Sequence, residues 1–178
     1  MAKRLGEKVV LKTKVFTIKD VDLEFDNGEK GTFQVLEKKD VAIIVPLDAE
    51  NNIILIKEYF TAINEYQYDL PGGRIEEGHD ELETANKELQ EEVGFKANRL
   101  DKLITVTMSP GYLTQKAHIF LARELEESSL KGDEKEKLEI LKWPFDKFEE
   151  LINSGKITEA RAIAALFLAR RFLNKESL

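Results

Sequence analysis

Three glutamates stand close together near the middle of the 178-residue chain. Glu88, Glu91 and Glu92 are spaced i, i+3 and i+4, so in a helix their side chains share one face. Like charges at that spacing destabilise a helix by about 0.2–0.5 kcal/mol per pair, and Lys87 offsets only part of that. A hard divalent cation would offset more, because Mg²⁺ or Mn²⁺ prefers oxygen ligands and binds through a few carboxylates and substrate phosphates.

The alternative interpretation of these glutamates is a solvated acidic face opposite a buried helical stripe. The glycines around the predicted helix favour the metal site instead. Gly72, Gly73 and Gly78 precede the helix and Gly94 follows it. Glycine lets the backbone approach closely, so carbonyl oxygens from this loop can reach the same place as the carboxylates.

The net charge of −7 is concentrated in the same region. Residues 76–92 contain eight acidic residues and one lysine, so this segment holds all of the excess negative charge. The remainder of the chain sums to zero, which disfavours nucleic acid as a partner. A substrate that is itself anionic would need bridging cations to bind beside this segment.

Residues 73–95, GRIEEGHDELETANKELQEEVGF, resemble the Nudix box, G-x5-E-x7-R-E-U-x-E-E-x-G-U, where U is a bulky aliphatic or aromatic residue. Two positions depart: His79 stands where the box has Glu, and Lys87 where it has Arg. Lys87 keeps a cation but loses the planar fork of arginine, and His79 supplies no carboxylate. The seven positions that match are Gly73, Glu88, Leu89, Glu91, Glu92, Gly94 and Phe95.

The resemblance extends beyond the box to most of the chain. The stretch YQYDLPGGRIEEG resembles the segment before the box in ADP-ribose pyrophosphatases, and MSPGYLTQKAHIFLA resembles the same branch. The closing stretch WPFDKFEELINSGKITEARAIAALFLARRFL is similar to bacterial ADP compounds hydrolases.

This resemblance implies hydrolysis of a nucleoside diphosphate linked to another group to a nucleoside monophosphate and a phosphorylated product. ADP-ribose or a related ADP compound is the expected substrate. NADH, diadenosine polyphosphates, nucleotide sugars and a non-catalytic nucleotide sensor remain as alternatives. The intact glutamates favour an enzyme over a sensor. By analogy, Mg²⁺ or Mn²⁺ would be held by Gly72, through its carbonyl, and by Glu88, Glu91, Glu92 and Glu136.

The general base has two candidates. In the ADP-ribose branch a glutamate on a loop outside the box activates water, and Glu134 occupies the matching position; Glu91 on the helix is the other candidate. The residues with a possible substrate-binding role are Lys57, Arg74, Gly111 and Tyr112. For these the alternative is a structural role, as exposed cations or as part of a turn.

The elements that must position these residues follow from periodicity and turn residues. Apolar Leu82, Ala85, Leu89 and Val93 predict a helix over 81–93, with Asp80 and Glu83 as a capping box and Gly94 as a left-handed cap. The glycine-rich stretch 71–78 predicts an exposed loop. His118 lies in an apolar strand and is expected to be a packed histidine. Strands are predicted over 9–11, 15–18, 32–36, 41–47, 52–59, 66–70, 100–107, 117–123 and 138–143.

The C-terminal third of the chain is predicted to alternate between loop and helix. Residues 124–137 form a polar loop, a short helix opens at Asp146 and ends near Gly155, and Thr158 caps a last helix. The expected fold is α+β, a Nudix-type α/β/α sandwich with a mixed sheet. Residues 1–38 form an N-terminal antiparallel β appendage, and residues 39–178 form the Nudix domain. The resemblance implies a homodimer in which the appendage helps to build the substrate site.

Composition favours a soluble, cytoplasmic protein. The chain has no cysteine, its longest apolar run is eight residues, and no apolar stretch follows the basic residues at the N-terminus. We therefore expect no membrane partner, no disulfide and no thiolate metal site.

Overall fold

A computed structural model describes residues 1–132 and 138–176 of the chain. Each predicted strand has a counterpart in it, and the ends of most elements lie within a few residues of the prediction. In chain order the elements are β1 (Lys3–Lys12), β2 (Thr17–Glu24), β3 (Lys30–Glu37), β4 (Val41–Pro46), β5 (Asn52–Phe60), β6 (Glu65–Asp69), β7 (Gly72–Arg74), α1 (Glu81–Glu92), β8 (Phe95–Thr107), β9 (Lys116–Glu127), β10 (Glu139–Pro144), the 3₁₀ turn η1 (Phe145–Lys147), α2 (Phe148–Asn153) and α3 (Ala160–Glu176).

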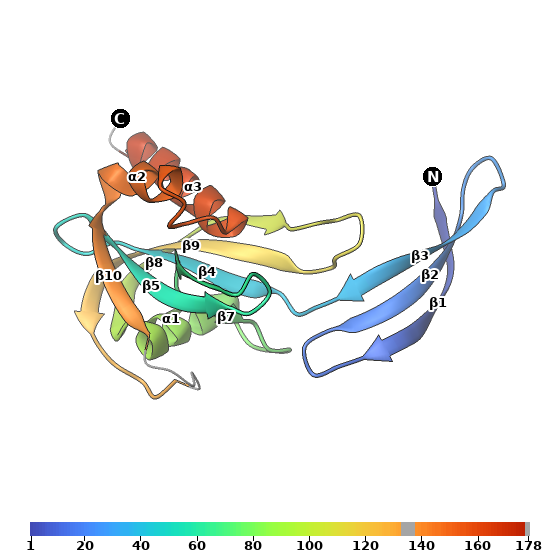
Figure 1. The fold of residues 1–178 in the computed structure, drawn as a ribbon, viewed down its shortest axis with the longest axis horizontal. Helices are drawn as coiled ribbons and strands as arrows, with labels where there is room; N and C mark the ends of the chain where they lie inside the picture. The colour runs from blue at the N-terminus through green and yellow to red at the C-terminus, as the bar shows by residue number, and fades with distance from the viewer. Residues whose placement is uncertain (133–137, 177–178) are drawn as a thin grey trace.

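Three sheets are formed. The central one has the order β7-β4-β9-β8, in which β4 and β9 are parallel and the other pairs are antiparallel. A second, antiparallel sheet has the order β10-β5-β6, and the turn between β4 and β5 joins it to the first. The third sheet, β1-β2-β3, projects away from the other two (Figure 1).

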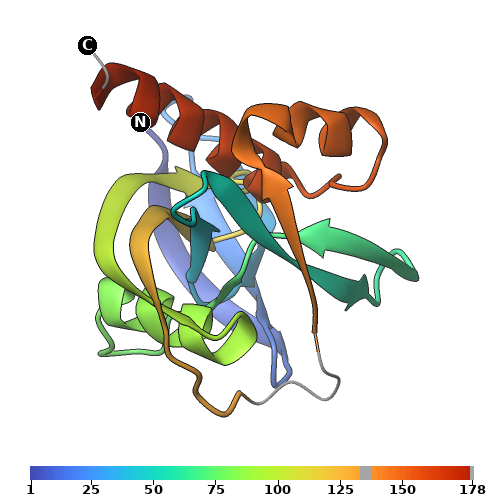
Figure 2. The ribbon, with the colours of Figure 1, turned by 90° about the vertical axis from the view of Figure 1, so that its left-hand side faces the viewer.

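The core is divided between the two faces of the central sheet. One layer packs Ala85 and Leu89 of α1 against Phe120 and its neighbours. The other layer packs α2 and α3 against the alternate residues of the same strands, including Ile119. Figure 2 shows α1 on one side of the sheets and α2 and α3 on the other. The predicted α/β/α sandwich with a mixed sheet is therefore confirmed.

The exposed loop predicted over 71–78 is partly wrong, because Gly72–Arg74 form β7 and pair with β4. The absence of a side chain permits this pairing. A Cβ built on Gly72 would lie 2.2 Å from the carbonyl oxygen of Ala42. Apolar alternation could not indicate this strand, since two of its three residues are glycine.

Two further boundaries differ from the prediction. Strand β9 continues to Glu127 and residues 125–127 pair with β8, so residues 124–127 do not belong to a loop. The cap of α3 is Glu159, whose Oε2 accepts the N–H of Ala162 at 2.9 Å. Thr158, the predicted cap, donates its hydroxyl to Gln67 in β6 instead. Both differences involve contacts with distant segments, with β8 in the first case and with Gln67 of β6 in the second.

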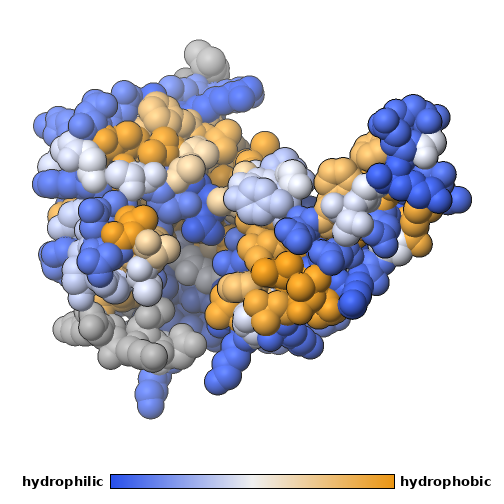
Figure 3. Space-filling model, turned by 45° about the vertical axis from the view of Figure 1, so that its right-hand side comes forward, coloured by the Kyte–Doolittle hydropathy of each residue, from blue (hydrophilic) through white to orange (hydrophobic). Residues whose placement is uncertain are grey.

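The N-terminal sheet buries little of its own apolar surface. Every residue of β1 is exposed, and within residues 1–38 the only apolar side chain in the buried core is Val21. In Figure 3 apolar side chains gather over this sheet and where it meets the rest of the chain. Its link to the body includes the Leu36 N–H, which donates to the carbonyl of Tyr112 at 2.6 Å. The exposed apolar residues of its first half include Leu5, Val9, Val10, Leu11 and Val15.

In the described chain, no helix has the length and apolar character needed to cross a membrane.

Asp69, at the end of β6, is a buried carboxyl beside the start of α3. Burial, helped by nearby Glu159, raises the pKa of Asp69 from 3.8 to about 7. Its folded form therefore binds a proton more tightly than its unfolded form. Through this group the free energy of unfolding falls as pH rises from about 4 to about 7.

We expect Asp69→Asn to remove this dependence of the free energy of unfolding on pH. At pH well above 7 the substitution should raise the free energy of unfolding, by at most about 4 kcal/mol. Urea unfolding of both proteins at about pH 5.5 and about pH 8 measures the effect. A variant that is destabilised equally at both pH values would show that Asp69 is not held as the neutral acid.

Candidate active site

Helix α1 is fixed at both ends by the residues predicted to cap it. The Asp80 carboxylate accepts the N–H groups of Leu82 at 2.8 Å and Glu83 at 3.1 Å. At the other end Gly94 has a φ of 77°, the left-handed conformation that favours glycine. With Ala85 and Leu89 buried against the sheet, the orientation of the whole helix is set.

The glutamates of α1 lie against the glycines of β7. The N–H of Gly72 donates to Oε2 of Glu92 at 2.9 Å. A Cβ built on Gly73 would lie 2.2 Å from the carboxyl carbon of Glu88. The glycines therefore let the strand backbone approach two carboxylates at once, as the sequence predicted.

These residues border a hollow of about 380 Å³. It brings together five residues predicted to act in the site: Gly72, Arg74, Glu88, Glu91 and Glu92. The remaining lining residues are Gly73, Glu76, His79, Thr84 and Lys87.

The carboxylates are engaged with the protein itself. Glu91 is 12% exposed and accepts a hydrogen bond from Nζ of Lys87 at 2.7 Å, while Glu92 holds the Gly72 N–H. Across residues 1–132 and 138–176, no three acidic or histidine side chains already converge as a metal cluster. The donor set nevertheless suits a hard cation, because carboxylate side chains gather at one glycine-lined hollow.

A comparison with known families matches residues 37–169 to the NUDIX domain. The chain belongs to the Nudix hydrolase family. Members of this family generally use divalent metal ions.

Relatives of known description match over nearly the whole chain. The chain is 37% identical over 171 residues to the ADP compounds hydrolase NudE of Escherichia coli (strain K12), covering 95% of this chain and 91% of that protein. It is 28% identical over 171 residues to the ADP-ribose pyrophosphatase of Bacillus subtilis (strain 168), covering 92% of each. A crystal structure of an ADP compounds hydrolase superposes with a TM-score of 0.90 at 36% identity, over 98% of this chain and 95% of that one.

Both departures from the Nudix box line the hollow. Lys87 extends along the helix to Glu91, one turn away. The backbone N–H of His79 donates to the carbonyl of Glu76 at 3.0 Å and so closes a turn before the helix. His79 replaces the first glutamate of the box, whereas the three glutamates on the helix, Glu88, Glu91 and Glu92, are all present.

The other predicted site residues lie elsewhere. Nζ of Lys57 lies 3.0 Å from Oε2 of Glu139 across the second sheet, and this hydrogen bond raises the pKa of Lys57. Gly111 and Tyr112 form the turn after β8, and neither they nor Lys57 border the hollow. Glu134 and Glu136 fall outside the described residues.

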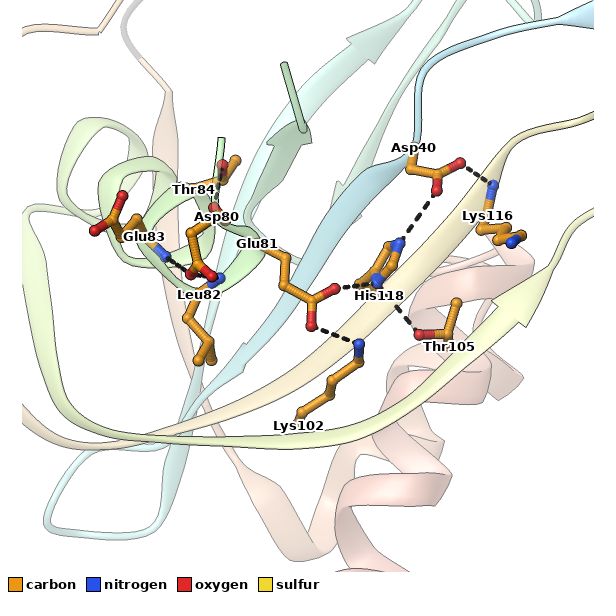
Figure 4. Close-up of polar contacts among 10 residues, drawn as sticks. All are labelled: Asp40, Asp80, Glu81, Leu82, Glu83, Thr84, Lys102, Thr105, Lys116 and His118. Atoms are coloured by element: carbon orange, nitrogen blue, oxygen red, sulfur yellow. Dashed lines mark hydrogen bonds and ion pairs between the residues drawn. The ribbon is translucent and has the colours of Figure 1, made fainter. Parts of the chain in front are cut away.

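His118 lies in the apolar strand β9 with its side chain largely buried, as predicted, but the prediction did not include its polar partners. Its ring lies between the carboxylates of Asp40 and Glu81, as Figure 4 shows. The sequence did indicate that Glu81 needs a polar partner, without indicating which one. Glu81 stands four residues before Ala85 and eight before Leu89, so an acidic residue begins the buried stripe of the Nudix helix and needs a polar partner on the sheet.

Proposed function

We propose that this Nudix hydrolase cleaves the pyrophosphate bond of ADP-ribose or a related ADP compound, releasing AMP and a phosphorylated product, with Mg²⁺ or Mn²⁺ as cofactor. One observation carries the proposal: Glu88 and Glu92 of the Nudix helix lie against the glycine strand β7. The descriptions of the relatives in Escherichia coli and Bacillus subtilis support ADP compounds as the substrate class.

The residues around the hollow have distinct parts in this proposal. Glu88, Glu91 and Glu92, together with the Gly72 carbonyl and Glu136, would hold the cations. When bound, such cations neutralise charge on the phosphoryl oxygens and lower the pKa of a bound water. Arg74 borders the hollow and would contact a substrate phosphate.

We favour Glu134 as the general base, with Glu91 as the alternative. The loop that leads toward Glu134 packs on the Nudix helix. A Cβ built on Gly132 would lie 3.4 Å from Cβ of Glu91, and the N–H of Leu130 donates to the carbonyl of Gln90 at 3.2 Å. These contacts bring the chain two residues before Glu134 beside the glutamates.

Glu134→Gln is therefore expected to lower kcat by on the order of a hundredfold to ten-thousandfold, since general base catalysis contributes about that much. Mn²⁺ affinity should change little, because the substitution leaves the helix glutamates in place. Steady-state kinetics and Mn²⁺ titration of the variant provide the measurement. Nearly full kcat in Glu134→Gln, combined with a large loss in Glu91→Gln, would assign the base to the helix.

The substrate assignment is tested by incubating the protein and Mg²⁺ with ADP-ribose, NADH, a diadenosine polyphosphate and a nucleotide sugar. Products are separated by chromatography, and AMP with ribose 5-phosphate is expected from ADP-ribose. Faster turnover of another member of the panel would move the assignment to that class. Tight binding of ADP-ribose without any product would favour a nucleotide sensor.

We also propose that residues 1–38 act as a dimerisation appendage on the domain formed by residues 39–178. The exposed apolar side chains of β1 support this, since the sheet is too small to bury them itself. In a homodimer this sheet could complete the partner's substrate site, where Lys57, Gly111 and Tyr112 would contact substrate.

A chain lacking residues 1–36 is expected to run as a monomer and to raise KM for ADP-ribose by about tenfold or more, because it loses both the interface and part of the substrate contacts. Size-exclusion chromatography with light scattering and steady-state kinetics measure the two effects. A full-length protein that is a fully active monomer would contradict the dimer.

A further inference from the structure

His118 lies on the face of β9 that packs against the Nudix helix. Its neighbour along that face, Phe120, is fully buried in the cluster with Ala85 and Leu89. His118 continues the same row toward the beginning of α1, where the helix presents Glu81. The apolar layer between helix and sheet therefore ends in a polar contact.

The histidine side chain contacts two carboxylates from different segments. Nε2 lies 3.3 Å from Oδ2 of Asp40, and Nδ1 makes a close ion pair with Glu81. The histidine side chain is only 15% exposed. Two further groups hold the arrangement: Oγ1 of Thr105 lies 3.2 Å from Nδ1, and Nζ of Lys102 contacts Glu81 at 2.5 Å. Each ring nitrogen of His118 therefore faces one carboxylate, and the two carboxylates come from different segments of the chain.

The two carboxylates lie at the two ends of the connection 75–81, since Asp40 is hydrogen-bonded to its first residue and Glu81 is its last. The carbonyl of Asp40 accepts the N–H of Ile75, the first residue after the glycine strand β7, at 2.9 Å. The Asp40 side chain also accepts the N–H of Lys116 at 2.8 Å, which fixes it to β9. Glu81 is the first residue of α1. His118 thus spans the connection 75–81, which joins the glycines of the site to its glutamates.

We propose that His118 is a positioning residue that sets the distance between β7 and the Nudix helix, and with it the geometry of the cation site. Through Asp40 it holds the end of the strand that supplies Gly72 and Gly73. Through Glu81 it holds the helix that supplies Glu88, Glu91 and Glu92. The effect on catalysis rests on the proposed function. The effect on the distance between β7 and the Nudix helix does not depend on the identity of the substrate.

The test uses His118→Phe, which keeps a ring in the same place but removes both nitrogens, and Glu81→Ala, which removes the contact on the helix. Glu83→Ala is the matched control, because it removes an acid from the same helical turn. The side chain of Glu83 is exposed and points away from His118 (Figure 4).

Mn²⁺ binding to the metal-free protein is measured by electron paramagnetic resonance, and amide hydrogen exchange over residues 75–85 by mass spectrometry. We expect His118→Phe and Glu81→Ala each to weaken Mn²⁺ binding about tenfold, as the loss of an outer partner does at other metal sites. Exchange over 75–85 should be faster in both variants and unchanged in Glu83→Ala. Because both act through one contact, the double variant should be no more than about twofold weaker than either single variant.

Kinetics separate positioning from general destabilisation. In His118→Phe and Glu81→Ala we expect kcat to fall about tenfold, while KM for ADP-ribose changes by less than about twofold. Wild-type Mn²⁺ affinity in His118→Phe, or effects that multiply in the double variant, would overturn the proposal. Should His118→Phe not fold, Glu81→Ala against Glu83→Ala gives the same decision. If the proposed function were wrong, the wild-type protein would bind Mn²⁺ but release no AMP.

Discussion

Gly73→Ala is expected to lower kcat by at least about a hundredfold while leaving the fold almost as stable as before. The new Cβ would occupy the place of the Glu88 carboxylate, 2.2 Å from its carboxyl carbon. The carboxylate ends a flexible side chain, so it can swing away at little cost to the fold. Catalysis does not tolerate that movement, since a displacement of about 1 Å at a reacting site costs about a hundredfold.

Kinetics with ADP-ribose and thermal unfolding without metal measure the two effects of Gly73→Ala. The melting temperature should stay within about 4 °C of the wild type, corresponding to a change of about 1 kcal/mol. Full activity in this variant would show that Glu88 need not occupy the position that it has against β7.

Gly72→Ala is expected to affect the fold itself. Here the new Cβ would lie 2.2 Å from the carbonyl oxygen of Ala42, a backbone atom of a fully buried residue in the central sheet. Backbone in the middle of a sheet cannot move aside as a carboxylate can. We expect a loss of about 3 kcal/mol, at the upper end of the cost of overpacking a core.

Thermal unfolding of the metal-free Gly72→Ala protein should show a melting temperature about 6–12 °C below that of the wild type. The absence of metal separates this effect from any role of the Gly72 carbonyl as a ligand. The neighbouring Gly73→Ala variant serves as its control, because it adds the same methyl group one residue away. Equal stability of the two variants would contradict the close pairing of β7 with β4.

The Nudix helix and its glutamates could be predicted from the sequence because the information is local. Asp80 and Gly94 cap the helix through their own side chain and backbone, and the i, i+3, i+4 spacing places Glu88, Glu91 and Glu92 together in any helix. The hydrophobic stripe of Ala85 and Leu89 sets which face is buried.

The features that could not be predicted depend on contacts between distant segments. Strand β7 exists because glycines fit against β4, and glycine patterns indicate turns and close approaches alike. His118 faces Asp40 and Glu81, 78 and 37 residues away, and an alternating apolar strand does not indicate which polar group lies opposite. Glu159 caps α3, whereas the hydroxyl of Thr158 donates its hydrogen bond to Gln67 of β6.

The most direct test of the proposed metal-dependent hydrolysis is the rate of AMP release from ADP-ribose by the wild-type protein and by Glu88→Gln, each with Mg²⁺ and with EDTA. A metal-dependent site on the Nudix helix predicts rapid release by the wild type with Mg²⁺ and none with EDTA. Glu88→Gln should be slower by on the order of a hundredfold to a thousandfold, because it removes a charged group that serves the transition state. Release that persists in EDTA, or a Glu88→Gln variant as fast as the wild type, would contradict a metal-dependent site on the Nudix helix.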